Sequence, residues 1–301
     1  MKRIKLSDQG PDFSNIVFGT MNWGSWGGNL NPQQTLTLIE KSMELGITTF
    51  DHADIYGDYT TEFDFGKALG LKPEVRQKIE LVTKCAIKKV TPNRSHHHIK
   101  SYDTSREHIL FSVDNSLKAL KTDYIDLLLI HRPDPLMNPG EVANVFERLK
   151  KEGKVRHFGV SNFTPSQFEM LDDHVSLVTN QVQASIQHLD PFLDGTLDQC
   201  IQKKIIPMAW SPLGGGKIFK ESTEPHINHL RQVIFELAQK YHVPLDQMML
   251  AWLMKHPSQI IPIIGTTKIE RVHSAVEATQ LDIDREDWFK MWEASTGEEV
   301  D

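Results

Sequence analysis

Short apolar runs alternate with longer amphipathic stretches along most of this chain. Eight of the runs have the length and the β-rich composition of buried strands, and they span residues 16–21, 47–51, 79–84, 124–131, 155–161, 177–183, 205–211 and 260–265. Strands that alternate with amphipathic helices are typical of βα units and a parallel sheet. The pattern therefore predicts an α/β fold.

The stretches between these runs have helical periodicity. Residues 32–46 have Pro32 at the start and Gly46 just past the end, the usual placement of these two residues at helix ends. Residues 104–121 form an apolar face at three- and four-residue steps, made by Ile109, Val113, Leu117 and Leu120. Eight such units predict a closed (β/α)8 TIM barrel, as a single domain over residues 1–301.

An open doubly wound sheet is the alternative architecture. That fold commonly has the sequence G-x-G-x-x-G after its first strand, and this chain has none there. The glycine-rich segment GGGK at 214–217 lacks the spacing and the hydroxyl of a phosphate-binding P-loop. We therefore expect the closed barrel.

Two segments lie outside the repeating pattern. Residues 1–15 read as an extended lead-in with a turn at residues 9–11, so we expect a short N-terminal hairpin that covers the bottom of the barrel. Residues 85–104 form a long polar connection, which fits either a functional loop or a mobile one. Three consecutive histidines at 96–98 lack a second ligand pair at zinc spacing, and we expect no metal.

Composition narrows the function classes. The chain has 301 residues with 39% hydrophobic and 24% charged residues, which is ordinary for a folded protein. A net charge of −7 and the lack of a long basic block argue against a nucleic-acid partner. The N-terminus has no apolar signal region and no run is long enough to span a bilayer, so we expect a cytoplasmic protein without a membrane segment.

Cysteine usage fits a reducing compartment. Only Cys85 and Cys200 are present, too few for a disulfide framework or a four-cysteine zinc site. Lys84 precedes Cys85 and could activate its thiolate. Neighbours on a strand face opposite sides, however, so we expect Cys85 to pack outward against a helix as a small hydrophobic residue.

Reactive side chains end three successive predicted strands. Asp51, Lys84 and His131 close the second, third and fourth strands, and Tyr56 follows Asp51 in the next loop. Each one alone fits a structural role, such as a helix cap, a rim aromatic, a surface charge or a buried histidine. Barrel enzymes carry their chemistry at the C-terminal ends of strands, where inward-facing charges need partners or a function. Together the four residues predict a catalytic site.

The chemistry of this set follows from pKa values. A tyrosine with an ordinary pKa of about 10 is a poor acid near neutral pH, but the ammonium of Lys84 would lower the pKa of Tyr56. Asp51 would hold Lys84 in place, and His131 could donate a hydrogen bond that orients a carbonyl oxygen. The set predicts a proton donor with an oxyanion clamp.

Motifs at these positions resemble the aldo-keto reductase family. The matching segments run in order along nearly the whole chain: FDHADIYG (50–57), LVTK (81–84), LLLIHRPDP (127–135), GKVRHFGVSNF (153–163), NQVQ (180–183), AWSPLGGG (209–216) and IPIIGTTKIER (261–271). The sequences of these motifs are most similar to those of the bacterial YdhF-like oxidoreductases. The resemblance implies that NADPH delivers a hydride to a small-molecule aldehyde or ketone. It implies that Tyr56 is the general acid, assisted by Asp51, Lys84 and His131.

The resemblance also implies a nicotinamide site. Ser161, Asn162 and Gln181 would hold the carboxamide, because their side chains can donate and accept hydrogen bonds. Trp210 stands where many relatives have a tyrosine stacked on the nicotinamide ring, and a tryptophan can stack as well. The segment that would approach the pyrophosphate contains Ser211, Leu213 and Gly214.

The last motif bears on which nucleotide binds. In the family this segment holds the adenosine 2′-phosphate, and here it contains Gly265, Thr266, Thr267 and Arg271. Many relatives have a lysine where Gly265 stands. Arg271 can grip a phosphate in a fork and Lys268 can restore a nearby charge, so NADPH is favoured and NADH stays possible.

Two tryptophans are candidates for the substrate wall. Trp23 and Trp26 follow the first predicted strand, and Trp23 is favoured because it lies nearer the strand end. A nicotinamide-binding regulatory or sensor protein with little turnover is the alternative function, since fold does not fix activity. A metal-dependent barrel hydrolase is a second alternative, and it would need convergent His and Asp ligands on several strands. The physiological carbonyl compound, the reaction direction and the oligomeric state are left open.

Overall fold

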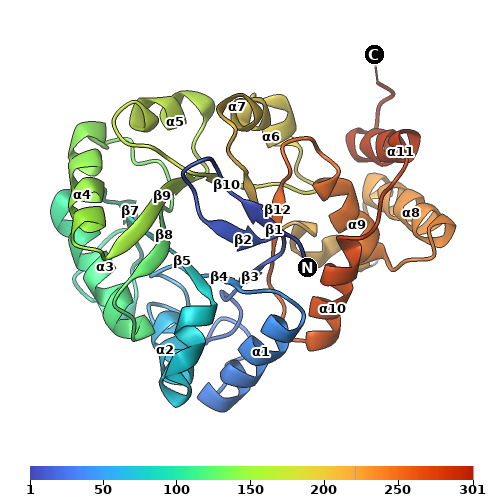
Figure 1. The fold of residues 1–301 in the computed structure, drawn as a ribbon. Coiled ribbons are helices and arrows are strands. Elements are labelled where there is room, and N and C mark those ends of the chain that lie inside the picture. Colours follow the sequence, from blue (N-terminus) through green and yellow to red (C-terminus); the bar gives the residue numbers. More distant parts are fainter. Residues whose placement is uncertain (221, 301) are drawn as a thin grey trace.

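Eight parallel strands close into a barrel in the computed structural model, which describes residues 1–220 and 222–300 (Figure 1). The strands in chain order are β3 (Val17–Gly19), β4 (Thr49–Asp51), β5 (Glu80–Cys85), β8 (Ile125–Ile130), β9 (Val155–Ser161), β10 (Asn180–Gln183), β11 (Met208–Trp210) and β12 (Ile261–Ile264). Pairing of Ile263 with Val17 joins β12 to β3 and completes the closure. The predicted (β/α)8 barrel and its eight strands are confirmed, although several strands are shorter than the apolar runs.

Helices surround the barrel on its outside (Figure 1). They are α1 (Pro32–Glu44), α2 (Thr61–Leu71), α3 (Arg106–Leu120), α4 (Pro139–Lys151), α5 (Pro165–Asp172), α6 (Asp190–Leu193), α7 (Thr196–Lys203), α8 (Pro225–Lys240), α9 (Leu245–Met254), α10 (Ile269–Ala278) and α11 (Arg285–Thr296). Helix α1 begins at a capping box of Asn31 and Gln34, and Gly46 follows its end with a φ of 88°. The proline start and glycine stop predicted for this helix are confirmed.

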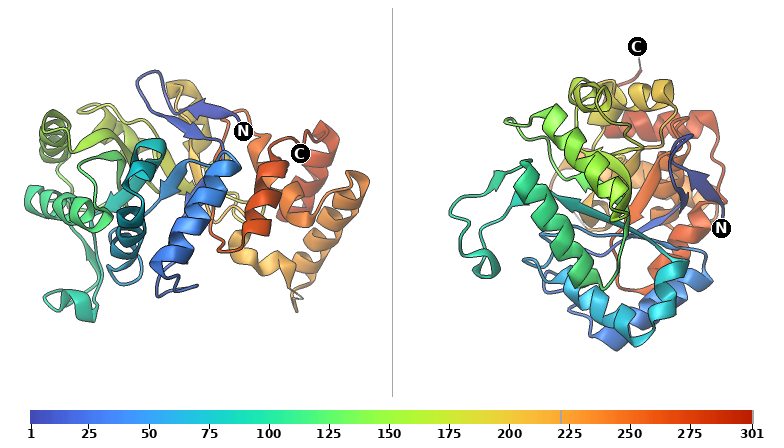
Figure 2. Two further views of the ribbon diagram at one scale, coloured as in Figure 1. Left: turned by 60° about the horizontal axis from the view of Figure 1, so that its bottom comes forward. Right: turned by 60° about the vertical axis from the view of Figure 1, so that its left-hand side comes forward.

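An N-terminal hairpin covers the end of the barrel at which the strands begin (Figure 2, left). Strands β1 (Arg3–Lys5) and β2 (Asp12–Ser14) pair antiparallel. Leu6 and Phe13 are fully buried in one cluster with inward-facing residues of the barrel. The amide of Leu6 donates to the Pro11 carbonyl at 3.0 Å, and the carbonyl of Leu6 accepts from the amide of Ile206 at 2.8 Å. The predicted hairpin is confirmed.

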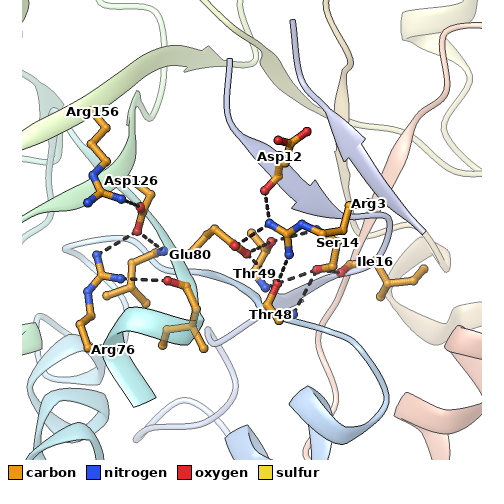
Figure 3. A network of polar contacts seen from close by, with 12 residues as sticks. Arg3, Asp12, Ser14, Ile16, Thr48, Thr49, Arg76, Glu80, Asp126 and Arg156 are labelled. Atoms are coloured by element: carbon orange, nitrogen blue, oxygen red, sulfur yellow. Dashed lines mark hydrogen bonds and ion pairs between the residues drawn. The ribbon is translucent and has the colours of Figure 1, made fainter. Parts of the chain in front are cut away.

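Charged side chains at this closed end pair with one another (Figure 3). The carboxylate of Asp126 accepts from Arg76 at 2.8 Å and from Arg156 at 3.0 Å. Arg3 donates to Glu80 at 2.6 Å, and Glu80 also accepts from the hydroxyl of Thr48 at 2.7 Å. These contacts join the first residues of neighbouring strands to the hairpin and to the segment after α2.

The polar connection at residues 85–104 has structure of its own. Strands β6 (Ile87–Lys88) and β7 (Ser101–Tyr102) pair antiparallel, and the segment between them projects from the body of the barrel (Figure 2, right). The backbone amide of Lys89 donates to the hydroxyl of Tyr59 at 2.8 Å, which ties this projection to the loop after β4.

Cys85 packs outward among apolar residues of α3 and α4, as expected for a small hydrophobic residue. Burial, reinforced by Asp54 and Glu62, raises the pKa of the Cys85 thiol well above its ordinary value. The neighbouring ammonium of Lys84 therefore does not activate it. None of the described helices combines the length and the apolar content needed to cross a bilayer.

Candidate active site

The four residues singled out at the strand ends meet at the C-terminal end of the barrel. Asp51 is the last residue of β4, Lys84 lies near the end of β5, and His131 directly follows β8. The ammonium of Lys84 donates to both oxygens of Asp51, at 2.8 and 2.7 Å. It also donates to the hydroxyl oxygen of Tyr56 at 3.3 Å. The side chains of Lys84 and Asp51 are only 1% and 3% exposed, so this ion pair is almost completely removed from water.

Lys84 remains charged in spite of its burial. Burial is the largest influence and lowers the pKa of Lys84, but the nearby Asp51 and Tyr56 together outweigh it and raise the pKa above its ordinary value. A third acceptor completes the ammonium's hydrogen bonds, the backbone carbonyl of His52 at 2.7 Å. No pattern in the sequence pointed to His52, because its contribution comes from the backbone.

Tyr56 behaves differently from the sequence-based expectation. Burial raises the pKa of Tyr56, and this influence exceeds the lowering by the ammonium of Lys84. The expected net lowering of the pKa is therefore wrong, because the sequence shows the neighbouring charge but not the loss of water around the phenol. Tyr56 keeps its proton at neutral pH and is available as a donor.

His131 faces Tyr56 as a neutral imidazole. The two rings meet edge to face, with centroids 6.1 Å apart. Burial, followed by the cations Lys84, Arg132 and Lys100, lowers the pKa of His131 well below its ordinary value. A neutral imidazole carries one N–H that can donate to a carbonyl oxygen. Its Nδ1 is buried without a hydrogen-bond partner among residues 1–220 and 222–300.

A tight turn directs Tyr56 toward Lys84. Gly57, Asp58 and Tyr59 all have positive φ, at 58°, 57° and 71°. A Cβ on Gly57 would lie 2.5 Å from the hydroxyl oxygen of Thr61, so only glycine fits at that point of the turn. The turn therefore fixes the direction from which the phenol enters the site.

The residues proposed for the carboxamide form a chain of hydrogen bonds beside Asp51. The amide of Gln181 donates to Asp51 at 2.9 Å, and the hydroxyl of Ser161 donates to the Gln181 carbonyl at 2.8 Å. Asn162 donates to Ser161 at 2.7 Å and accepts from the indole of Trp210 at 2.9 Å. The structure thus brings these four candidates together along one wall of the site. The contact between Gln181 and Asp51 was not predicted.

The loop after β11 requires glycine. Ser211 and the glycines at 214–216 have positive φ, with 59° at Gly214. A Cβ on Gly214 would lie 2.2 Å from Oε1 of Gln187, whereas one on Gly215 would meet nothing within 4 Å. A backbone without side chains can approach a phosphate closely, which fits the role expected of this segment. Leu213 is half-buried and packs between two apolar clusters.

The segment after β12 lies beside the loop that follows β3. Asn22 donates to the Gly265 carbonyl at 3.2 Å, and the indole of Trp23 donates to the Thr266 carbonyl at 3.2 Å. Thr267 is half-buried in the same segment, and Arg271 is exposed at the start of α10. Within the described chain Arg271 forms no ion pair, so no carboxylate of these residues holds its guanidinium.

The two candidate tryptophans have opposite surroundings. Trp23 is 3% exposed and its ring packs edge to face on Phe18, with centroids 4.7 Å apart. Trp26 is 36% exposed, and its ring centroid lies 6.2 Å from that of Tyr56. The loop turns back on itself after Trp23 and carries that side chain into an aromatic cluster outside the barrel. The placement therefore favours Trp26 over Trp23 as the substrate wall.

Comparison with known proteins decides the family. The family model described as "Aldo/keto reductase family" matches residues 15–295. The chain belongs to the aldo/keto reductase family. Among the relatives, the "Oxidoreductase YdhF" of Escherichia coli (strain K12) is 46% identical over 303 residues, covering 100% of this chain and 99% of that protein. The resemblance to YdhF-like oxidoreductases is thus confirmed.

Two further proteins extend this picture of an aldo/keto reductase. A "6-dehydroglucose reductase" of Agrobacterium fabrum (strain C58 / ATCC 33970) is 40% identical over 302 residues and covers 100% of both chains. The crystal structure of the thermostable aldo-keto reductase Tm1743 with the inhibitor epalrestat superposes with a TM-score of 0.81 at 26% identity. That match covers 98% of this chain and 100% of the other. The protein is an oxidoreductase of this family.

Proposed function

We propose that the protein reduces an aldehyde or ketone to an alcohol with NADPH, with Tyr56 as the proton donor. One observation carries the proposal: the protonated phenol of Tyr56 lies 3.3 Å from a buried ammonium, Lys84, that Asp51 holds in place. When bound, the nicotinamide supplies a hydride to the carbonyl carbon. Hydride and proton together convert the carbonyl into the alcohol.

Each side chain has a separate task in this proposal. His131 donates a hydrogen bond from its neutral ring and orients the carbonyl oxygen. The Tyr56 hydroxyl gives its proton to that oxygen as negative charge develops there. Lys84 stabilises the phenolate that remains, and Asp51 limits the cost of keeping the ammonium buried. The phenolate then regains its proton from solvent.

The donor set beside Asp51 fits a nicotinamide cofactor. The amide and hydroxyl groups of Ser161, Asn162 and Gln181 can donate and accept hydrogen bonds, and Trp210 offers an aromatic face. The glycine-rich loop beginning at Gly214 suits a pyrophosphate.

We propose cytoplasmic action on a small-molecule carbonyl compound, with Trp26 as the apolar wall of the substrate site. The similarity to the 6-dehydroglucose reductase of Agrobacterium fabrum supports an aldehyde of a sugar as one candidate substrate.

Replacement of Tyr56 by phenylalanine tests the proton donor. Tyr56→Phe removes one hydroxyl and keeps the ring, so we expect carbonyl reduction to fall by about 100- to 10,000-fold while NADPH affinity stays nearly constant. Single-turnover oxidation of bound NADPH, followed by absorbance with a fixed aldehyde, reports the chemical step. A rate equal to that of the parent protein would disprove the role of Tyr56. NADPH binding without turnover in the parent would instead favour a sensor.

Arg271 tests the choice of nucleotide. We expect the parent to bind NADPH more tightly than NADH, and Arg271→Ala to narrow the difference by about tenfold, because it removes a charge-assisted contact to the 2′-phosphate. Fluorescence titration with both nucleotides measures the two Kd values. Arg285→Ala, which removes an arginine from α11 instead, is the control and should keep the difference. Equal affinities for the two nucleotides in the parent would contradict the expectation.

A further inference from the structure

The residue after His131 is an arginine with no assigned role. The guanidinium carbon of Arg132 lies 5.4 Å from the centroid of the Trp210 ring. Arg132 is partly buried, and within residues 1–220 and 222–300 it forms no ion pair. It therefore stands between the histidine that faces Tyr56 and the tryptophan at the end of β11, with its charge uncompensated by a carboxylate of the described chain.

The surroundings of Arg132 carry an excess of positive charge. Lys84, Arg132 and Lys100 all act on His131 and disfavour its protonated form. Lys84 is paired with Asp51, but Lys100, like Arg132, forms no ion pair in the part of the chain that the structure describes. The chain as a whole has a net charge of −7, so the local charge around His131 is opposite in sign to the net charge of the protein.

Two acids of the surrounding loops, Asp134 and Asp58, are already engaged with other groups. Asp134 accepts from the backbone amide of Thr104 at 3.0 Å, from the Thr104 hydroxyl at 2.9 Å and from the amide of Leu136 at 2.9 Å. Asp58 pairs with Lys89. Their oxygens are therefore occupied by loop contacts, and Arg132 keeps its donors for another acceptor.

We propose that Arg132 binds an anionic group on the substrate, so that the preferred substrates are aldehydes or ketones carrying a carboxylate or a phosphate. This inference rests on the proposed reductase function. A carbonyl oxygen held by Tyr56 and His131 places the rest of the substrate next to the residue that follows His131. The planar guanidinium matches the two oxygens of a carboxylate or phosphate in a fork. A positive mouth also raises the local concentration of anionic substrates.

Matched pairs of substrates test the inference. The first pair is 4-carboxybenzaldehyde and its methyl ester, and the second is glyceraldehyde 3-phosphate and glyceraldehyde. We expect the parent enzyme to show a higher kcat/KM for the anionic member of at least one pair. The first pair reports carboxylate recognition and the second phosphate recognition. The advantage should shrink as ionic strength rises, because salt screens the attraction.

Substitution of Arg132 assigns the effect to this residue. Arg132→Gln should lower the ratio of kcat/KM for the anionic over the neutral member by about 10- to 100-fold, and Arg132→Lys should retain part of that ratio. Arg285→Gln is the matched control, since Arg285 also lies 5.4 Å from an aromatic ring, that of Phe289, but on α11. The control should leave the ratio unchanged.

The outcomes separate this inference from the proposed function. If the parent reduces the neutral members as well as the anionic ones, or if Arg132→Gln lowers both equally, the inference is wrong and the reductase function stands. A loss of NADPH affinity in Arg132→Gln that accounts for the change would also overturn it, because Arg132 would then contact the cofactor. If the parent oxidises NADPH with none of the four compounds, the proposed function itself fails.

Discussion

The two ends of the barrel use charged side chains in opposite ways. At the end covered by the hairpin, Asp126 is shared by two arginines and Glu80 by an arginine and two threonines. At the other end a buried pair, Lys84 with Asp51, stands beside a histidine nitrogen without a partner in the described residues. Polar groups at the closed end satisfy one another, whereas at the open end His131 and Arg132 keep donors or acceptors without a partner among the described residues.

This difference has an energetic meaning. The Lys84–Asp51 side chains are 1% and 3% exposed, against 9% and 7% for Arg76 and Asp126. Deeper burial raises the cost of removing both ions from water, and a buried ion pair is weak support for stability. We therefore interpret the pair at the open end as one kept for chemistry, and the network at the closed end as one that holds strands and hairpin together.

Removal of the ammonium at the open end should have the largest effect. Lys84→Met leaves Tyr56 without the group that stabilises its phenolate, so we expect single-turnover reduction to slow by about 100-fold or more. Lys84 lowers the pKa of Tyr56, so its loss should raise that pKa further and move any alkaline limb of the rate profile to higher pH. Rates measured across pH in parent and variant check both points.

The same variant also leaves the Asp51 carboxylate buried with Gln181 as its remaining side-chain donor. A double variant that adds Asp51→Asn removes this unpaired charge and should recover stability in chemical denaturation but not activity. Recovery of activity in the double variant would mean that Lys84 acts only through the fold.

Breaking the network at the closed end should affect stability alone. Asp126→Ala leaves the largely buried guanidinium of Arg76 without its carboxylate, and we expect a loss of about 3 to 5 kcal/mol in the free energy of unfolding. Turnover per folded molecule should stay at the parent value, because Asp126 lies at the opposite end from Tyr56. Chemical denaturation and active-site titration measure the two quantities. Asp123→Ala, at an exposed position nearby, is the control and should change stability by less than about 0.5 kcal/mol.

The smallest effect is expected at the rim of the same network. Arg3 pairs with Glu80 through a side chain that is 43% exposed, and solvent screens such pairs. Arg3→Ala should cost less than about 1 kcal/mol, and the loss should decrease at high salt. Denaturation at two ionic strengths checks this. A loss of stability as large as that of Asp126→Ala would mean that exposure to solvent does not explain which ion pairs of this network contribute most to stability.

The sequence predicted the elements whose signal is local. Apolar periodicity located all the barrel strands, and the position of Asp51, Lys84 and His131 at strand ends indicated one site, because parallel strands in a barrel end on the same side. The β6–β7 pairing was not predicted, since each strand has only two residues and no apolar alternation.

Features that depend on three-dimensional surroundings could not be predicted from the sequence. The direction of the pKa shift of Tyr56 depends on how much water the fold removes. The choice between Trp23 and Trp26 depends on a loop that reverses after Trp23, where the amide of Leu30 donates to the Trp23 carbonyl at 2.8 Å. Proximity to a strand end did not determine where that side chain points.

The hairpin that covers the barrel imposes an order on folding. It precedes every barrel strand in the chain, so the ribosome delivers it before the surfaces it contacts. Leu6 bonds to Ile206 and packs beside Met208, so this docking waits until those residues have been synthesised. Contacts between residues so far apart in sequence form slowly, because the entropy of closing the intervening chain must be overcome first. A segment that is synthesised before all the barrel strands is therefore among the last to reach its native place.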